Sequence, residues 1–373
     1  MPLVPIWFWN FPWRTGQSRY RRMQPRRERV DTSVMAARRR ALGVLISTVF
    51  ILTLLAPLTA CHAAAEPAPL VLEKTIPLPD VSGRIDHMAF DRKRQRLIVA
   101  ALGNDTVEIV DLAAGKPLHR IRGLKEPQGV AYVEQADIIF TANAGDGSVR
   151  TYRGADFTAL ERFDLGRDAD NIRIDPRNGT VVVGYGNGSL AIIDPASRAV
   201  IGTVALHGHP EGFQIDPAAG RAFVNVPDAG QIAIVDLDAR RQVATWKVPG
   251  VSGNFPMALD SARGVLAVVF RSPTSLVLFD VKTGAVMARL PVCGDPDDIF
   301  FDARRERIYV SCGVGEIAVF QRDGENYRPL ARVASETGAR TSLFVPEADR
   351  LFLAVRAGLL GSGASIQIYR PTP

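Results

Sequence analysis

Cysteine and histidine are scarce in this chain of 373 residues, which contains three cysteines and five histidines. Three cysteines are too few for a scaffold held together by disulfides. The chain also lacks a CxxCH haem-attachment segment, an HExxH zinc motif, a glycine-rich phosphate loop and a local Ser–His–Asp signature. These absences remove the enzyme classes that a short motif identifies, so any functional site must form from residues far apart in the sequence.

A basic surface for nucleic acid is also lacking, although the formal net charge is +6. Residues 1–60 contain ten arginines and two acidic residues, and the rest of the chain is therefore slightly acidic. We expect no nucleic-acid partner on this ground.

Residues 35–61 have the three parts of an export signal, namely an arginine-rich start, an apolar run and a small-residue end. The segment 58–61, LTAC, is similar to a bacterial lipobox, in which the cysteine is acylated and becomes the mature N-terminus. We expect a periplasmic lipoprotein that contacts the membrane only through lipid on Cys61. Simple secretion, with cleavage in HAAAE after Cys61, and an uncleaved anchor over residues 41–60 are the alternatives.

Residues 1–34 do not fit an export signal, because they would place a long extension before its charged region. We expect translation to start at Met35, which makes residues 1–34 a wrongly assigned upstream extension. Residues 62–69 are expected to form a linker. Cys293 and Cys312 flank one predicted hairpin in an oxidising compartment, where they form either a disulfide or two buried thiols.

One segment recurs seven times at a nearly constant spacing. Its opening strand reads HMAFD, GVAYV, NIRID, GFQID, PMALD, DIFFD and SLFVP, and successive copies are 41 to 44 residues apart. Each copy continues through a turn into strands such as AFVNV, QIAIVDL and QVATWKV, which are rich in β-branched residues. Four antiparallel strands in each repeat predict an all-β fold, a seven-bladed β-propeller over residues 70–373.

The last copy ends after three strands, near 342–346, 350–355 and 364–370. Residues 70–78, LVLEKTIPL, form an additional strand before the first copy. We predict that this strand completes the seventh blade and closes the ring, because closure removes an open sheet edge.

The copies AFVNVPDAGQIAIVDLDARRQVATWKV and IYVSCGVGEIAVF resemble the YVTN-type repeats of bacterial seven-bladed propellers, the YncE-like group. The resemblance covers about residues 70–370. It implies export but no common activity. Single-stranded DNA binding is associated with the group, and the wider propeller class includes lactonases, lyases and dehydrogenase subunits. The WD dipeptide of eukaryotic repeats is absent.

The loop before the first strand of each blade surrounds one mouth of a propeller's central channel, where residues distant in sequence converge. Aligning the copies places seven residues in one ring, namely Asp86, Gln128, Asp170, Glu211, Phe255, Asp297 and Thr341. Neighbouring positions add His87, Asn171, His209, Asn254, Asp295, Asp298 and Arg340. Carboxylates crowded at this mouth must be protonated, pair with arginine or histidine, or bind a cation.

The oxygen-rich mouth favours Ca²⁺ over a transition metal, with Glu211, Asn171, Asn254 and Asp297 as expected ligands. Our main hypothesis is a monomeric binding or scaffold protein of the envelope, whose acidic mouth takes a small polar ligand or an envelope protein. One alternative is a cation-dependent, lactonase-like hydrolase with a mouth histidine as base. The other alternative is binding of single-stranded nucleic acid.

Overall fold

The computed structural model describes residues 68–358 and 363–373. The expected upstream extension, the export signal with Cys61 and most of the expected linker lie outside these residues. Within the described part of the chain, no helix is both long enough and apolar enough to cross a membrane.

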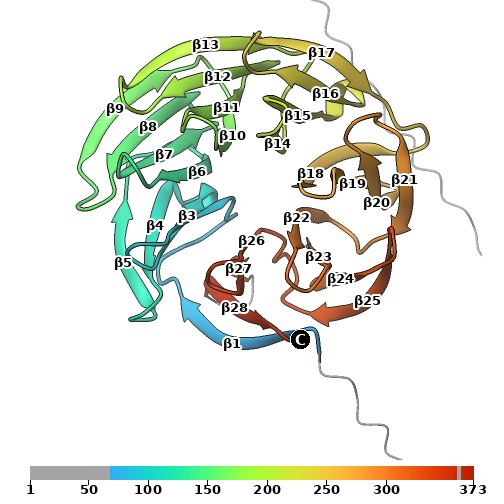
Figure 1. Cartoon of the computed structure of the whole chain (residues 1–373). Helices are drawn as coiled ribbons and strands as arrows, with labels where there is room; N and C mark the ends of the chain where they lie inside the picture. Colours follow the sequence, from blue (N-terminus) through green and yellow to red (C-terminus); the bar gives the residue numbers. More distant parts are fainter. Residues whose placement is uncertain (1–67, 359–362) are drawn as a thin grey trace, which may run out of the picture. The chain divides into compact units, whose positions relative to one another are not determined.

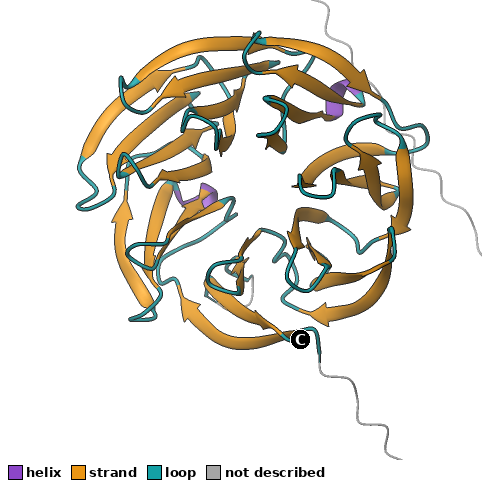
Figure 2. Ribbon diagram, viewed as in Figure 1, coloured by secondary structure: helices purple, strands orange, loops and turns teal. Residues whose placement is uncertain are grey.

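The described chain forms seven four-stranded antiparallel sheets arranged as blades around a central axis (Figures 1 and 2). This confirms the predicted seven-bladed β-propeller. The strands of blades one to three are β2 (Met88–Asp91), β3 (Arg96–Ala101), β4 (Thr106–Asp111), β5 (Lys116–Ile121), β6 (Pro127–Val133), β7 (Ile138–Asn143), β8 (Ser148–Arg153), β9 (Ala159–Asp164), β10 (Ala169–Ile174), β11 (Val181–Tyr185), β12 (Ser189–Asp194) and β13 (Ala199–Ala205).

The strands of blades four to six are β14 (Phe213–Asp216), β15 (Arg221–Val226), β16 (Gln231–Asp236), β17 (Arg241–Trp246), β18 (Ser252–Asp260), β19 (Val265–Ser272), β20 (Thr274–Asp280), β21 (Val286–Pro291), β22 (Pro296–Asp302), β23 (Arg307–Cys312), β24 (Glu316–Asp323) and β25 (Asn326–Ala334). Blade seven contains β26 (Ser342–Val345), β27 (Arg350–Val355), β28 (Ser365–Pro371) and β1 (Leu70–Pro77). Two short 3-10 helices, η1 (Leu102–Asn104) and η2 (Pro227–Ala229), lie in loops.

The first described strand closes the ring, as the sequence predicts. Strand β1 pairs antiparallel with β28, from Leu70 opposite Pro371 to Pro77 opposite Ser365. In Figure 1 the blue β1 runs beside the red β28, so the start and the end of the described chain share one blade. The last blade therefore has four strands like the others.

The position of a strand in its blade explains its residue pattern. Strand β16 is almost entirely buried because both of its faces pack in hydrophobic cores, and the four central residues of its sequence QIAIVD are apolar. Strand β17 lies at the outer edge and is mostly exposed, with the sequence RQVATW. Between blades four and five, the Trp246 ring packs 5.3 Å from the Phe223 ring and 6.0 Å from the Phe279 ring, measured between centroids.

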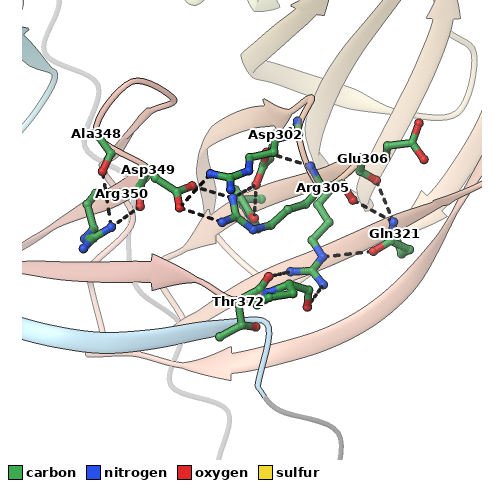
Figure 3. Close-up of polar contacts among 12 residues, drawn as sticks. Asp302, Arg305, Glu306, Gln321, Ala348, Asp349, Arg350 and Thr372 are labelled. Atoms are coloured by element: carbon green, nitrogen blue, oxygen red, sulfur yellow. Dashed lines mark hydrogen bonds and ion pairs between the residues drawn. The ribbon is translucent and has the colours of Figure 1, made fainter.

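A buried aspartate at the end of the inner strand joins neighbouring blades through an arginine. Asp302 is 2% exposed, and Arg305 donates to it at 3.0 Å and to Asp349 of blade seven at 2.6 Å (Figure 3). The same arrangement recurs in Asp91–Arg94–Asp137, Asp175–Arg177–Asp238 and Asp260–Arg263–Glu306. The repeated Asp turns of the sequence are therefore structural links between blades.

A disulfide between Cys293 and Cys312 fixes one side of the channel mouth. Cys293 lies in the loop before β22, and Cys312 ends β23 beside it. Because this loop leads directly into Asp297, the crosslink restrains the backbone that carries a mouth carboxylate.

Candidate functional site

The mouth of the central channel encloses a charged cavity of about 200 Å³. The cavity is lined by Arg84, Asp86, His87, Gln128, Asp170, Asn171, Arg173, Glu211, Gly212, Phe255, Pro256, Met257, Arg271, Asp297, Asp298 and Arg340. The structure thus brings together most of the residues that the repeat alignment selects, although they come from all seven blades or the loops before them.

Four of the expected mouth residues do not line this cavity. Asp295 lies outside it and pairs with Arg340 at 2.6 Å, and His209 lies at its edge, beside Asp170. Thr341 is buried beside the cavity, and its hydroxyl donates to the Ile85 carbonyl at 3.2 Å. Asn254 is 1% exposed and does not line the cavity, because its amide nitrogen donates at 2.9 Å to Asn225 Oδ1 and to the Gln231 carbonyl of blade four. Asn254 is therefore turned into the interface between blades four and five, which corrects its expected place in a mouth ligand set.

Irregular pairing of the inner strands places consecutive polar residues at the mouth. The register between β10 and β11 shifts between Ala169 and Ile172, and the register between β22 and β23 shifts between Pro296 and Asp298. A regular strand points successive side chains to opposite faces, and a bulge breaks that alternation. As a result, Asp170 and its neighbour Asn171 both line the cavity.

Arginines neutralise one side of the acidic ring. Arg84 pairs with Asp86 at 2.9 Å, and Arg340 pairs with Asp297 at 3.0 Å. Arg271 also pairs with Asp297. Because Arg340 follows blade six and Arg271 belongs to blade five, this ion-pair cluster holds neighbouring blades together at the mouth.

Three of these cavity arginines, Arg84, Arg173 and Arg271, are absent from the sequence-based site. The sequence does single out Arg173, because a long charged residue stands where three other copies of the repeat have alanine, namely Ala89, Ala131 and Ala258. Nothing in the sequence pattern marks Arg271 as a mouth residue, since it comes from the extended end of β19 rather than from an inner strand. Its guanidinium carbon lies 3.9 Å from the centre of the Phe255 ring.

Burial changes the protonation of the paired carboxylates. Burial, together with the charge of Asp170, raises the pKa of Asp86 from 3.8 to about 7, against the opposing charges of Arg84 and Arg340. Burial and the charge of Asp86 also raise the pKa of Asp297. The mouth therefore does not carry a full negative charge on every acid at neutral pH.

Two groups lie deeper on the channel wall. Burial raises the pKa of Asp298 well above 3.8, although its carboxylate accepts the backbone N–H of Ser342 at 2.7 Å. Burial lowers the pKa of His87, whose Nε2 lies 3.9 Å from Asp86 Oδ1. His87 lines the cavity and is therefore placed to accept a proton from a bound molecule.

The opposite side of the ring has a different composition. Asp170, His209 and Glu211 offer ligand atoms that all lie within 4.8 Å of one another. Burial opposes the charged form of His209, but Asp170 and the Gly186 carbonyl favour it, and its pKa rises from 6.5 to about 9. Burial and the charge of Asp170 raise the pKa of Glu211 from 4.5 to about 8. This side can hold a cation or share protons between histidine and carboxylates.

A second chamber of about 410 Å³ continues the channel beyond the mouth. It is lined mainly by apolar side chains of the inner strands, including Phe90, Tyr132 and Phe300. His87, Arg173 and Asp298 line both spaces and form the boundary between them. The channel therefore changes from charged to mostly apolar over a few residues of each inner strand.

The fold and this cavity define a seven-bladed β-propeller with a charged mouth to its central channel. No protein-family model matches the chain, and no curated protein sequence matches it. A chain of the Kuenenia stuttgartiensis hydrazine synthase structure is similar, with a TM-score of 0.67 and 15% identity over 75% of this chain and 94% of that one. A chain of the mitotic checkpoint complex has a TM-score of 0.70 and 14% identity over 88% of this chain and 100% of that one. At these identities the likeness shows the fold alone.

Proposed function

We propose that this propeller binds a small polar ligand in its channel mouth, and that Arg173 receives an anionic group of that ligand, such as a carboxylate. The observation behind this proposal is that Arg173 lines the cavity without an ion-pair partner in the described chain. Its Nη1 donates to the Ile172 carbonyl at 2.7 Å, and no acidic group among the described residues forms an ion pair with it. Burial lowers the pKa of Arg173 against the opposing charges of Asp298 and Asp170, which reflects the cost of a half-buried charge without an ion-pair partner.

A ligand carboxylate would offset this cost, because guanidinium binds carboxylate through two parallel hydrogen bonds. Arg173 stands at the boundary of the two chambers, so the rest of the ligand has two directions open to it. A polar part would face the mouth carboxylates, and an apolar part would enter the chamber lined by Phe90 and Phe300.

The test is a binding screen of small carboxylates, namely acetate, succinate, glutamate and 3-phenylpropionate, by thermal shift followed by calorimetry. We expect Arg173→Ala to weaken binding about 10- to 100-fold, which corresponds to about 1.5–3 kcal/mol for hydrogen bonds to a charged group. Alanine fits this position because other blades carry it there. Arg328→Ala, on the exposed outer strand β25, is the matched control. Binding that survives Arg173→Ala unchanged would contradict the proposal.

A hydrolase acting on lactones or simple esters is a second candidate, favoured by the position of His209 beside two carboxylates. Turnover of a lactone panel that is lost in Glu211→Gln would support it. If no substrate of the panel is turned over, with or without added divalent cations, this candidate fails. Binding of single-stranded nucleic acid stays a hypothesis from the sequence.

We also propose that the protein is an exported, lipid-anchored relative of the YncE-like propellers. The signal-like segment 35–61 and the YVTN-type repeats support this proposal. In cells, Cys61→Ala should move the protein from the membrane fraction to the soluble fraction. An unchanged distribution would argue against a lipid on Cys61.

A further inference from the structure

Beyond the carboxylate site, we propose that Asp170, His209 and Glu211 form a binding site for a divalent transition-metal ion such as Zn²⁺ or Mn²⁺. Asp170 belongs to β10 of blade three, whereas His209 and Glu211 lie in the loop that leads into blade four. Their ligand atoms, one from each residue, lie within 4.8 Å of one another.

Within the described part of the chain, no arginine or lysine forms an ion pair with the carboxylates on this side of the mouth, although Arg173 and Arg271 line the same cavity. Asp86 and Asp297 on the other side form ion pairs with arginines. Among the residues that the structure describes, the only basic side chain in ion-pair range of Asp170 is His209, and none pairs with Glu211. A divalent ion bound by neutral His209 would place a positive charge in direct contact with both carboxylates, in the position that a proton on His209 otherwise fills.

Two buried oxygens point independently to a ligand. Asp170 is 4% exposed, and its Oδ1 accepts no hydrogen bond from any group in residues 68–358 and 363–373. Asn171 is 2% exposed, lines the same cavity, and its Oδ1 likewise has no hydrogen-bond partner within those residues. Burying a carboxylate or an amide oxygen without a partner is costly. A bound ion would offset that cost at Asp170, and Asn171 would serve as an additional oxygen donor.

The ring of His209 is oriented as in metal sites. Nδ1 lies 2.6 Å from the Gly186 carbonyl, which can only accept, so Nδ1 carries a hydrogen and donates it. The neutral ring then has its free lone pair on Nε2, which lies 3.8 Å from Asp170 Oδ2. A metal-binding histidine characteristically donates its other nitrogen to a carbonyl or carboxylate in this way. The carboxylate of Asp168, 3.4 Å from Nδ1, adds a second anchor.

The backbone that carries these groups is also fixed. The Glu211 N–H donates to the Asn225 carbonyl at 2.9 Å, and the Gly186 N–H donates to the Arg167 carbonyl at 3.0 Å. In a tetrahedral site with bonds of about 2.1 Å, ligand atoms are about 3.4 Å apart. Each ligand atom therefore needs to move by less than about 1 Å, which side-chain rotation provides.

One imidazole nitrogen with carboxylate oxygens favours Zn²⁺ or Mn²⁺ over Ca²⁺, which takes six to eight oxygens. This proposal replaces the oxygen-only set of the sequence analysis, from which Asn254 is turned away. The competing arrangement is a protonated His209 that itself balances Asp170 and Glu211 without an ion.

The experiment is calorimetric titration of the EDTA-stripped, dialysed protein with ZnCl₂, MnCl₂ and CaCl₂, without any organic ligand. We expect one Zn²⁺ or Mn²⁺ per chain and at least 10-fold weaker binding of Ca²⁺. His209→Gln and Glu211→Gln, which preserve side-chain size approximately, should each weaken Zn²⁺ binding at least 100-fold. The exposed histidine of outer strand β5 gives the control His119→Gln, which should bind as the wild type does.

Cobalt substitution provides a second readout that does not depend on stability. Co²⁺ bound at this site should give visible d–d absorption that His209→Gln changes and His119→Gln does not. Circular dichroism of each variant checks that the propeller is folded. No binding of Zn²⁺ or Mn²⁺ by the folded wild type, or equal affinity in all variants, would overturn the metal site. Neither result would affect carboxylate binding at Arg173, so the two proposals fail separately.

Discussion

Replacing Asp86 by asparagine should make the stability of the propeller less dependent on pH. The Asp86 side chain is buried, and burial with the charge of Asp170 raises its pKa from 3.8 to about 7. A raised carboxyl pKa means that the folded state holds the proton more tightly than the unfolded state. The free energy of unfolding therefore falls as pH rises from about 4, and the loss is complete above pH 7.

The size of the effect follows from the shift. About three pKa units at 1.36 kcal/mol each give a total of about 4 kcal/mol, of which about 2.5 kcal/mol is lost between pH 5 and 8. Asparagine is always neutral and nearly the same size as the protonated acid. Asp86→Asn should therefore lose about 2.5 kcal/mol less than the wild type over this pH range.

The assay is urea unfolding at pH 5, 6, 7 and 8 in EDTA, with the slope of the transition checked for each sample. Glu325→Gln removes one charge in the exposed turn between β24 and β25 and serves as the control. If the wild type and Asp86→Asn lose equal free energy between pH 5 and 8, Asp86 does not hold a proton at neutral pH. The explanation of how the mouth tolerates its acids would then be wrong.

Three further predictions concern the frame around the site. Deleting Leu70–Pro77 should expose the edge of β28 and lead to dimers or aggregates, which size-exclusion chromatography with light scattering would detect. A stable monomer would contradict ring closure by β1. The double substitution of Cys293 and Cys312 by alanine, compared with the oxidised protein, should lower the free energy of unfolding by about 3 kcal/mol, because the disulfide closes a loop over a separation of 19 residues. Arg305→Met should cost about 3–5 kcal/mol in urea unfolding, because a buried carboxylate loses its partner, and removing Asp349 alone should cost less.

The sequence predicts much of the fold because its evidence is local and repeated. A period of 41 to 44 residues, alternating strands and turn residues at matching positions are enough to identify seven blades. The unpaired strand 70–78 and the incomplete last copy are enough to predict closure, and the structure confirms it. The same alignment selects Asp86, Asp170 and Glu211 for the mouth, since equivalent positions of equivalent blades meet at one end of the channel.

The sequence alone thus determines the seven blades, the order of their strands and most of the residues at the mouth. Only the tertiary structure decides which of the mouth carboxylates pair with arginine and which lie beside histidine. Arg271 and Arg340 reach Asp297 from elsewhere in the ring, whereas His209 stands beside Asp170. These pairings depend on bulges in the inner strands and on side-chain direction across blade boundaries. A repeat fixes where a backbone position lies, but the partner of each charge is set by contacts that differ from one blade to the next.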